Sequence, residues 1–312
     1  MKVLVTGAGG FIGREVLRLL ATNDGIHVTA SDVDLRGLSA SPRLRLVPGD
    51  IADSPVLEAA VGEGVDAVIH LAAVPGGAAE QDPAASRRVN IDATVDLFDA
   101  VASGGRRPRV VFASTIAVFG DELPAVGVDD RTPLAPRLVY GGHKAMIETW
   151  LATLHRRGAV SGVALRLPGI IARPKGPSGM KSAFLSNLFH ALRAGEPFVS
   201  PVSAGATMWA MSVAQVARNL VHGLHVSDEL LPEGRALTLP ALWVGWSALI
   251  DEVARQTGRA TPSVVFEPDA ALEAAFGAYP PLTTPAGEQA GFSHDGDVAT
   301  LVGRALEHIA RG

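Results

Sequence analysis

The chain contains no cysteine among its 312 residues. That absence excludes disulfide bonds, catalysis by a thiolate and metal sites built from thiolates, and it is typical of a reducing compartment such as the cytoplasm. The N-terminus predicts the same cytoplasmic location, because Met1 to Val5 leads directly into a glycine-rich turn instead of the apolar stretch of an export signal.

Basic charge is also in short supply. The net charge is -5, and the chain has no basic tail or arginine-rich run, so nucleic acid is not an expected partner. With 47% hydrophobic residues, the composition is that of a globular protein long enough to bury a large core.

One uncharged segment, residues 197–217, is long enough to raise the question of a membrane span. It contains two prolines, three serines, a threonine, a glutamine and a glycine, so its hydropathy is poor for a span. We expect a buried loop and strand instead, and no membrane partner.

A glycine-rich turn near the N-terminus joins a predicted strand to a predicted helix. The strand covers residues 3–6, glycines follow at 7, 10 and 13, and residues 14–20 have apolar side chains at helical spacing. Glycines here allow a tight turn and the close approach of a pyrophosphate to the N-terminus of the helix. The pattern therefore predicts a dinucleotide site.

Asp32 ends the next predicted strand, which begins at His27. A carboxylate at this point can accept hydrogen bonds from an adenosine ribose. Asp32 and Asp34 would repel a 2'-phosphate, which favours NAD over NADP, although Arg36 keeps NADP as an alternative. Asp50 follows the third predicted strand and is placed to meet the adenine amino group.

Further strands and helices alternate along the chain. A buried strand over 65–71 ends in the small residues Ala72 and Ala73, a helical region covers about 84–103, and another strand begins at Arg109. This order predicts an α/β fold with a doubly wound parallel sheet of Rossmann type. We expect an NAD-binding domain over 1–165 and a small C-terminal substrate lobe over 166–312, with a strand and a helix returning to the first domain.

Tyr140 and Lys144 are one helical turn apart, so the phenol and the ammonium lie on the same face of a helix. A free phenol has a pKa of about 10, but a neighbouring ammonium and a helix N-terminus both favour the phenolate. Tyr140 can therefore act as a general base. An isolated pair of this spacing is more often a coincidence on the surface, and it needs support from other motifs.

Ser114 and Thr115 end the strand that begins at Arg109, at the edge where open α/β sheets bind their ligands. A hydroxyl at this edge can hydrogen-bond the substrate oxygen that is oxidised. The alternative is that these residues only cap the strand.

Basic residues are concentrated between Thr149 and Ser227, a stretch that contains eight of them and a single acidic residue, Glu196. A basic substrate lobe on an acidic protein suggests an anionic substrate. Arg173, Lys175 and Lys181 are the candidates to bind it, although any one of them can equally be a solvated surface charge. A nucleotide-sugar would suit the same lobe.

The motifs occur in an order that resembles the extended short-chain dehydrogenases/reductases of the NAD-dependent epimerase/dehydratase family. The resemblance rests on Thr6-Gly7-x-x-Gly10-x-x-Gly13, Asp32, Asp50, Leu71-Ala-Ala73, Ser114-Thr-x-x-Val-Phe-Gly120 and Tyr140-x-x-x-Lys144. Beyond Trp150 the chain is similar to one subgroup, the D-erythronate dehydrogenases. The matching stretches are residues 165–170, 173–178, 182–184, Trp209 with Ser212, 216–222 and 237–240.

The resemblance implies roles for individual residues. Thr115 is the expected catalytic hydroxyl, with Ser114 the less favoured choice, Tyr140 the proton acceptor, and Lys144 the residue that binds ribose and steadies the phenolate. The implied contacts to NAD come from Gly7, Gly10, Phe11, Ile12, Gly13, Asp32, Asp50, Ile51, Leu71, Ala72, Ala73, Asn90, Tyr140, Lys144 and Pro168. The implied substrate contacts come from Ser114, Thr115, Arg173, Lys175 and Trp209.

The expected reaction is the NAD-dependent oxidation of the C2 hydroxyl of a short sugar acid, D-erythronate to 2-oxo-tetronate, by a homodimer. No His, Asp and Glu cluster has metal-ligand spacing, so no metal is expected. The alternatives are a nucleotide-sugar 4-epimerase or dehydratase, an enzyme similar to L-threonine 3-dehydrogenase, and a cofactor-sensing binding protein that performs no reaction.

Overall fold

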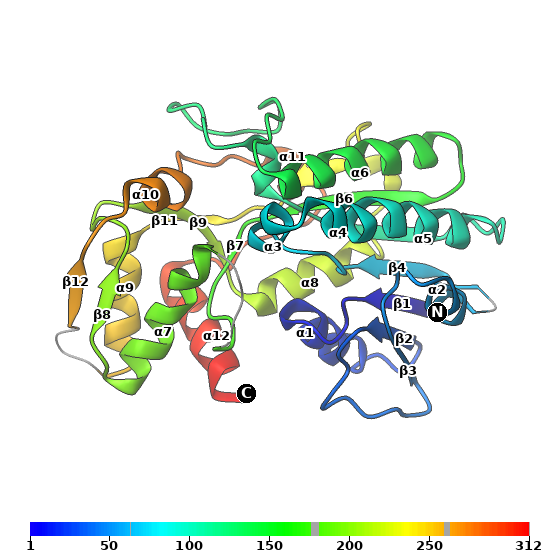
Figure 1. Cartoon of the computed structure of the whole chain (residues 1–312), viewed down its shortest axis with the longest axis horizontal. Helices are drawn as coiled ribbons and strands as arrows, with labels where there is room; N and C mark the ends of the chain where they lie inside the picture. The colour runs from blue at the N-terminus through cyan, green and yellow to red at the C-terminus, as the bar shows by residue number, and fades with distance from the viewer. Residues whose placement is uncertain (63, 176–180, 259–262, 312) are drawn as a thin grey trace.

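The computed structural model describes residues 1–62, 64–175, 181–258 and 263–311. A parallel sheet with helices on both faces forms one part of the molecule, and a smaller lobe stands beside it (Figure 1). The seven strands follow the order β10-β6-β5-β4-β1-β2-β3, and every neighbouring pair is parallel. This is the doubly wound order of dinucleotide-binding folds, as the alternation of strands and helices predicts. The strands are β1 (Lys2–Thr6), β2 (His27–Asp32), β3 (Leu44–Pro48), β4 (Ala67–His70), β5 (Arg109–Thr115), β6 (Ser161–Leu167) and β10 (Ala236–Thr238).

Two apolar layers hold helices against the faces of this sheet. On one face, α1 (Phe11–Leu20) and α8 (Val213–Gly223) pack together against the strands. On the other face lie α2 (Ser54–Val61), α5 (Ala93–Ala102) and α6 (Val139–Arg156). The strands read as near-continuous apolar runs because helices cover them on both sides.

The helical region expected over 84–103 is interrupted. It consists of α4 (Pro83–Arg87), a π-helical turn η1 (Arg88–Asp92) and α5. Asn90 lies in the π turn, and its amide bonds to both backbone groups of Val74. A π turn inside a helix often marks a functional position, and here it brings an amide onto the loop that follows β4.

The lobe has its own core and two small sheets. One sheet contains β7 (Gly169–Ile170), β9 (Thr207–Met211) and β11 (Leu242–Gly245), and the other contains β8 (Phe198–Ser200) and β12 (Val264–Phe266). The helices α7 (Phe184–Ala194), α9 (Trp246–Gln256) and α12 (Val298–Arg311) surround them. The short helix α10 (Ala270–Phe276) also packs on this core. Two other short helices lie against the larger part: α3 (Gly76–Gln81) contacts α6, and α11 (Pro285–Gln289) contacts β10.

The chain crosses between the two parts several times. It leaves the large sheet after Leu167, returns through α8 and β10, and enters the lobe again at Leu242. Residues 197–217 form β8, β9 and the start of α8, and no helix in the described ranges is both long and apolar enough to cross a membrane.

Candidate active site

The glycine turn lies where β1 meets α1. Gly7 has a φ of +67°, and a Cβ on Gly13 would lie 2.2 Å from the carbonyl oxygen of Gly7. Larger residues at these positions would therefore push the helix off the strand. Helix α1 begins at Phe11 with no side-chain cap at Gly10 and no acid in its first turn. Its first N–H groups and the positive end of its dipole are left for an anion, which fits a pyrophosphate.

Gly9 is a fourth necessary glycine, which the sequence analysis did not single out. A Cβ there would lie 1.8 Å from the carbonyl oxygen of Asp34, and its N–H donates to Asp32 Oδ2 at 2.9 Å. Asp32 Oδ1 accepts from the N–H of Asp34 at 3.1 Å. The Asp32 carboxylate is thus held against the glycine turn, where the sequence predicts the ribose.

Arg36, the residue that kept NADP as an alternative, is bound to a carboxylate. Its guanidinium donates to Asp34 through Nε at 2.9 Å and Nη2 at 2.5 Å. These bonds hold the pKa of Asp34 far below its usual range. An arginine engaged in this way is poorly placed to receive a 2'-phosphate.

The residues expected around the adenine and along the cofactor differ in their exposure. Asp50 is bound to Arg88 at 2.7 Å and to the N–H of Ala52 at 3.0 Å, and Ile51 is buried beside it. In the loop after β4, Leu71, Ala72 and Ala73 are partly exposed, and so are Phe11 and Ile12. Pro168, at the end of β6, is buried.

Asn90 is 2% exposed and is hydrogen-bonded to the loop after β4. Its Nδ2 donates to the Val74 carbonyl at 3.0 Å, and its Oδ1 accepts from the Val74 N–H at 2.7 Å. The amide is therefore committed to the backbone, and its effect on a cofactor would pass through the position of the loop.

The structure brings Thr115, Tyr140 and Lys144 to one edge of the sheet, because β5 ends where α6 begins. Lys144 Nζ donates to the carbonyl of Ala113 at 2.8 Å and lies 5.6 Å from the centre of the Tyr140 ring. Thr115 Oγ1 accepts from the N–H of Ala117 at 3.2 Å, so its own proton remains available to donate.

Burial shifts the pKa values of both titrating groups toward their neutral forms. It raises the pKa of Tyr140 to about 12, against the opposing effect of Arg173, and it lowers the pKa of Lys144 to about 7, against the opposing effect of Glu148. Such displaced values are typical of active sites.

Gly141 explains how α6 comes so close to β5. A Cβ on Gly141 would lie 2.5 Å from the carbonyl oxygen of Ala117, in the short turn η2 (Ile116–Phe119) that follows Thr115. A Cβ on the neighbouring Gly142 would meet nothing within 4 Å. The sequence presents the two glycines as equivalent, and only the fold separates them.

Ser114 and Thr115 point to different surroundings, as successive residues of a strand do. Ser114 is 2% exposed, and its hydroxyl donates to Glu148 Oε1 at 2.5 Å. Glu148 also accepts from Arg166 through Nε at 3.0 Å and Nη2 at 2.8 Å. The Ser114 hydroxyl is therefore engaged inside the protein, whereas Thr115 is partly exposed at the end of the strand. Glu148 and Arg166 are buried polar residues that sequence reasoning missed, although the helical spacing from Lys144 to Glu148 is a signal that could have found the first.

Arg173 is a basic residue of the lobe that lies close to the glycine turn. Its guanidinium lies 5.4 Å from the centre of the Phe11 ring, at the first turn of α1, and its charge acts on Tyr140. Its backbone is fixed by Ser186 and His190, and it follows Ala172, which has a φ of +60°. A non-glycine residue in this conformation is uncommon and marks a constrained position.

Other basic residues between Thr149 and Ser227, among those that the structure describes, lie away from Arg173. Arg156 and Arg157 lie at the far end of α6 from Tyr140, Lys175 is exposed 4.0 Å from Glu196, and the Lys181 side chain lies outside the described residues. The excess of basic residues is thus not a single patch. Trp209 is buried: it is 1% exposed, and its indole N–H donates to the Pro280 carbonyl at 2.7 Å.

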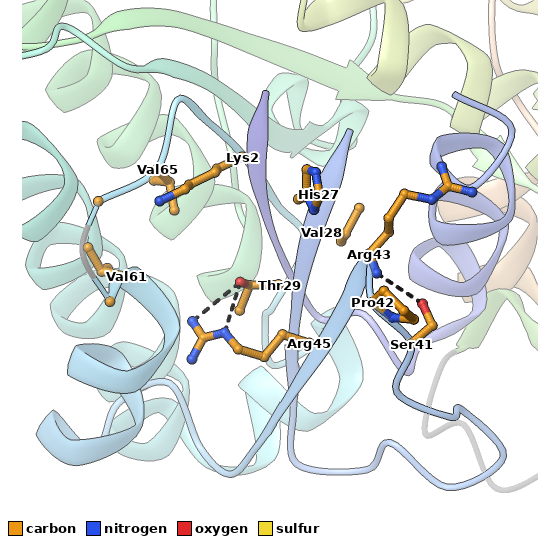
Figure 2. Close-up of a pocket in the computed structure, with 12 residues that line it drawn as sticks. Lys2, His27, Val28, Thr29, Ser41, Pro42, Arg43, Arg45, Val61 and Val65 are labelled. Carbon is orange, nitrogen blue, oxygen red and sulfur yellow. Dashed lines mark hydrogen bonds between the residues drawn. The ribbon is translucent and has the colours of Figure 1, made fainter. Parts of the chain in front are cut away.

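A cavity of about 410 Å³ lies at the opposite edge of the sheet (Figure 2). It is lined by the amino ends of β1 and β2, where Lys2 and His27 begin the strands. Arg43 donates to the carbonyl of Asn23 after α1, and Arg45 donates to the carbonyl of Ala59 in α2. These arginines cap helices, and the cavity has no part in the site at the carboxyl ends.

Comparisons with known proteins agree with this arrangement. The sequence pattern of the NAD dependent epimerase/dehydratase family matches residues 3–222. A D-erythronate dehydrogenase from Cupriavidus necator is 35% identical over 291 residues, which is 90% of each chain. Another, from Haemophilus influenzae, is 30% identical over 266 residues, covering 83% of this chain and 84% of its own.

Solved structures resemble the whole chain. A nucleoside-diphosphate-sugar epimerase from Agrobacterium tumefaciens has a TM-score of 0.89 and 29% identity, and the match covers 100% of this chain and 95% of that one. An L-threonine dehydrogenase from Cupriavidus necator has a TM-score of 0.87 at 23% identity, covering 99% and 100% of the two chains. The second likeness is one of fold.

Proposed function

This chain belongs to the NAD dependent epimerase/dehydratase family, and on that premise we propose that it is an NAD-dependent dehydrogenase that oxidises the C2 hydroxyl of a short sugar acid. D-erythronate, which would yield 2-oxo-tetronate, is the proposed substrate. The observation that supports the proposal is that Lys144, bound to Ala113 near the end of β5, lies 5.6 Å from the centre of the Tyr140 ring, while Thr115 ends the same strand.

The cofactor would be held by the N-terminus of α1 and by Asp32. The uncapped first turn of α1 suits the pyrophosphate, and the Asp32 carboxylate suits the ribose hydroxyls of NAD. The Asp34–Arg36 pair favours NAD over NADP. When bound, NAD supplies the acceptor for the hydride that leaves C2.

The proton chemistry would belong to the side chains of this chain. Thr115 donates a hydrogen bond to the C2 oxygen, and the Tyr140 phenolate removes the C2 hydroxyl proton. Charged Lys144 favours that phenolate, and after one bond to Ala113 it keeps donors for a ribose. Because burial raises the pKa of Tyr140 to about 12, positive charge close to the ring is needed for the base to form near neutral pH.

The substrate carboxylate would be bound by Arg173. This guanidinium is half-buried beside Phe11, whereas the Lys175 ammonium is exposed and close to Glu196. Arg173→Met should raise KM for the acid about ten- to a hundredfold, the effect of one lost charged hydrogen bond. Lys175→Met is the matched control and should leave KM unchanged. Equal effects of the two substitutions would contradict the assignment.

Purified protein should therefore reduce NAD with D-erythronate, and Tyr140→Phe should abolish turnover while NAD still binds. The substrate panel contains four- to six-carbon aldonates, L-threonine and UDP-sugars. Retained activity in Tyr140→Phe would reject Tyr140 as the base. No reduction with any acid, together with cofactor already bound as purified, would favour a nucleotide-sugar epimerase or dehydratase, the class of the similar Agrobacterium tumefaciens structure. Turnover of L-threonine alone would favour a threonine dehydrogenase, and NAD binding without turnover a sensing protein.

A cytoplasmic homodimer completes the proposal. Met146 on α6 is 59% exposed, and α5 and α6 lie side by side on the outside of the sheet (Figure 1). Apolar side chains on such a face suit a twofold interface. Light scattering should give twice the chain mass of 32.3 kDa, and Met146→Glu should shift the protein toward monomer.

A further inference from the structure

Two successive residues of β5 connect it to α6. The carbonyl of Ala113 accepts from Lys144 and the hydroxyl of Ser114 donates to Glu148, and the next residue, Thr115, ends the strand. Lys144 and Glu148 are one helical turn apart, as are Tyr140 and Lys144. The helix is thus held against the strand over the stretch that carries the proposed catalytic groups.

Glu148 joins three elements of the site. It lies on α6 and bonds to Ser114 on β5 and to Arg166 on β6. Ser114 and Arg166 are direct neighbours in the register of the two strands. One carboxylate therefore connects the strand that ends in Thr115, the helix that carries Tyr140 and the strand that leads to Pro168.

Glu148 carries a negative charge in a region where the positively charged side chains of Arg166 and Lys144 are largely shielded from water. The Glu148 side chain is 4% exposed and that of Arg166 is 11% exposed, and Lys144 is 2% exposed. Within the described ranges, no carboxylate lies within 4.0 Å of Lys144 Nζ, so Lys144 has no direct ion pair there. A carboxylate nearby still favours the charged amine, because the site is shielded from water.

The titratable and charged groups of this region come from α6, β4, β6 and the lobe, whereas β5 contributes only the Ala113 carbonyl and the Phe112 ring. α6 contributes Tyr140 and Glu148, β6 contributes Arg166, and the lobe contributes Arg173 through its effect on Tyr140. β4 contributes His70, whose pKa burial lowers to about 3, so that it is neutral. Burial lowers the pKa of Lys144 to about 7, and Glu148 opposes that change.

We propose that Glu148 is a positioning residue whose negative charge keeps Lys144 protonated and whose hydrogen bonds hold the catalytic helix against β5. The proposal rests on the proposed function only for the roles given to Tyr140 and Lys144. Its consequence is that Glu148 sets the pH range of turnover without touching substrate or cofactor. Above the pKa of Lys144 the ammonium is lost, and the Tyr140 phenolate loses its stabilising charge.

The test measures the charge of Lys144 directly. The chain has four lysines, Lys2, Lys144, Lys175 and Lys181, so lysine-selective isotope labelling gives few NMR signals, and Lys144→Met assigns the one of interest. Glu148→Gln keeps the shape and an acceptor oxygen but removes the charge. The pKa of Lys144 should fall by about one pH unit or more, as expected for the loss of a neighbouring opposite charge.

Two further variants make the expected result specific. Arg166→Met removes the cation that shares Glu148, so the pKa of Lys144 should rise. Ser114→Ala removes a hydrogen bond but no charge, so the pKa should stay within a few tenths of a pH unit of the wild-type value. An unchanged pKa of Lys144 in folded Glu148→Gln would overturn the proposal, and so would a failure of both Glu148→Gln and Arg166→Met to fold, because the pair would then be purely structural.

Activity provides the second measurement. In Glu148→Gln the alkaline limb of kcat/KM should move to lower pH together with the pKa of Lys144, while KM for the acid changes little. If the wild-type protein turns over no acid, the proposed function fails, but the NMR titration still decides the role of Glu148. If the acid is oxidised and the pKa of Lys144 does not move, the function stands and the role of Glu148 is rejected.

Discussion

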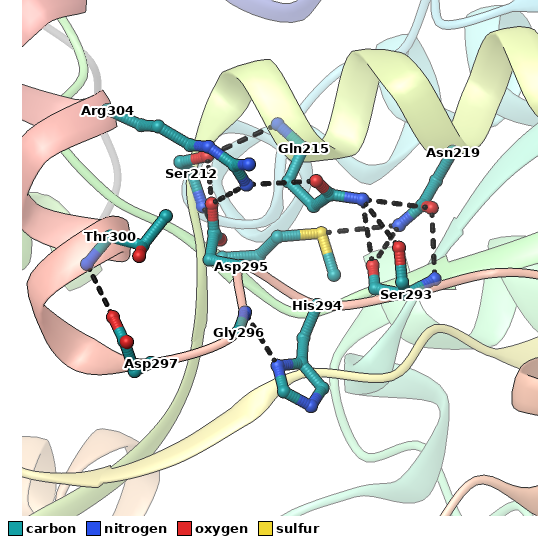
Figure 3. A network of polar contacts seen from close by, with 11 residues as sticks. Ser212, Gln215, Asn219, Ser293, His294, Asp295, Gly296, Asp297, Thr300 and Arg304 are labelled. Atoms are coloured by element: carbon teal, nitrogen blue, oxygen red, sulfur yellow. Dashed lines mark hydrogen bonds and ion pairs between the residues drawn. The ribbon is translucent and has the colours of Figure 1, made fainter.

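Two buried carboxylates in different parts of the molecule have nearly the same partners. Glu148 accepts from the Ser114 hydroxyl and pairs with Arg166 at 2.8 Å. Asp295 accepts from the Ser212 hydroxyl at 2.6 Å and pairs with Arg304 at 2.8 Å (Figure 3). In each network a serine hydroxyl and an arginine satisfy one carboxylate, as burial of such a charge requires.

The surroundings of the two networks differ. Asp295 also accepts from the N–H of Ser212, the cap of α8, and the side chains of Gln215 and Asn219 donate to Ser293 nearby. These contacts attach the segment before α12 to the start of α8 (Figure 3). Glu148 instead lies one helical turn from a buried lysine. The same set of partners thus joins chain segments in both places, and only around Glu148 does it do so beside a buried lysine.

The largest difference should appear when each carboxylate is replaced by an apolar residue. Glu148→Leu leaves Arg166 buried, with 11% of its side chain exposed, whereas Asp295→Leu leaves Arg304, which is 25% exposed and can be rehydrated. The free energy of unfolding should fall by about 3–5 kcal/mol in the first variant and by about 1–3 kcal/mol in the second. Denaturant titration measures both, and a larger loss for Asp295→Leu would reverse the comparison.

A smaller effect is expected from moving α6 without changing any charge. Gly141→Ala places a Cβ against the Ala117 carbonyl and should cost about 1–3 kcal/mol, with a loss of turnover. Gly142→Ala is the matched control, and it should raise stability by roughly 0.5–1 kcal/mol because its Cβ meets nothing. The pKa of Lys144 should change less in Gly141→Ala than in Glu148→Gln. If it changes equally, position and charge are not separable at this site.

Of the two networks, only the one around Glu148, which lies beside Lys144, should make the free energy of unfolding depend on pH between neutral and alkaline pH. The pKa of Lys144 is lowered in the folded protein to about 7, so between pH 7 and the ordinary lysine value of about 10.4 the unfolded chain binds more protons. Stability from this group therefore rises with pH in that window, by at most about 1.4 kcal/mol per pH unit. Lys144→Met should remove this slope and Asp295→Asn should keep it, as measured by denaturation at several pH values.

The smallest change in stability is expected when both charges of the Glu148–Arg166 pair are removed together. Glu148→Met with Arg166→Met leaves no unpaired charge, so stability should return to within about 1.5 kcal/mol of the wild type. Turnover should remain low, because Ser114 and Lys144 have lost the carboxylate. A double variant with full turnover would show that the pair is structural, like the one around Asp295.

Local sequence was sufficient for much of the framework. The turn from Gly7 to Gly13 and Asp32 are short-range patterns, because a strand, a tight turn and a helix N-terminus are all encoded by neighbouring residues. The spacing of Tyr140 and Lys144 required only the helical period. The parallel sheet follows from the alternation of strands and helices, and the structure has it in the expected order.

Composition predicted the site residues less well, because the number of charged residues in a segment does not say where their side chains point. The basic residues between Thr149 and Ser227 predict an anion site as a group, yet in the structure Arg166 binds Glu148, Arg193 binds the carbonyl of Ile309, and Arg173 lies against Phe11. Trp209 matches a motif but faces a buried cluster. Whether a charge or a ring faces a cleft depends on the packing of distant segments.

The sequence by itself determined the fold class and the glycine turn, and it singled out Tyr140 and Lys144 as the proposed base and its lysine, since each pattern depends on residues within one or two turns of chain. Only the tertiary structure decided that Gly141 is the close contact and Gly142 is not, that Ser114 serves Glu148, and that Glu148 joins β5, α6 and β6. The reason is physical. These roles come from contacts between strands and helices far apart in the chain, and no local pattern records which side chains share one buried, weakly screened space.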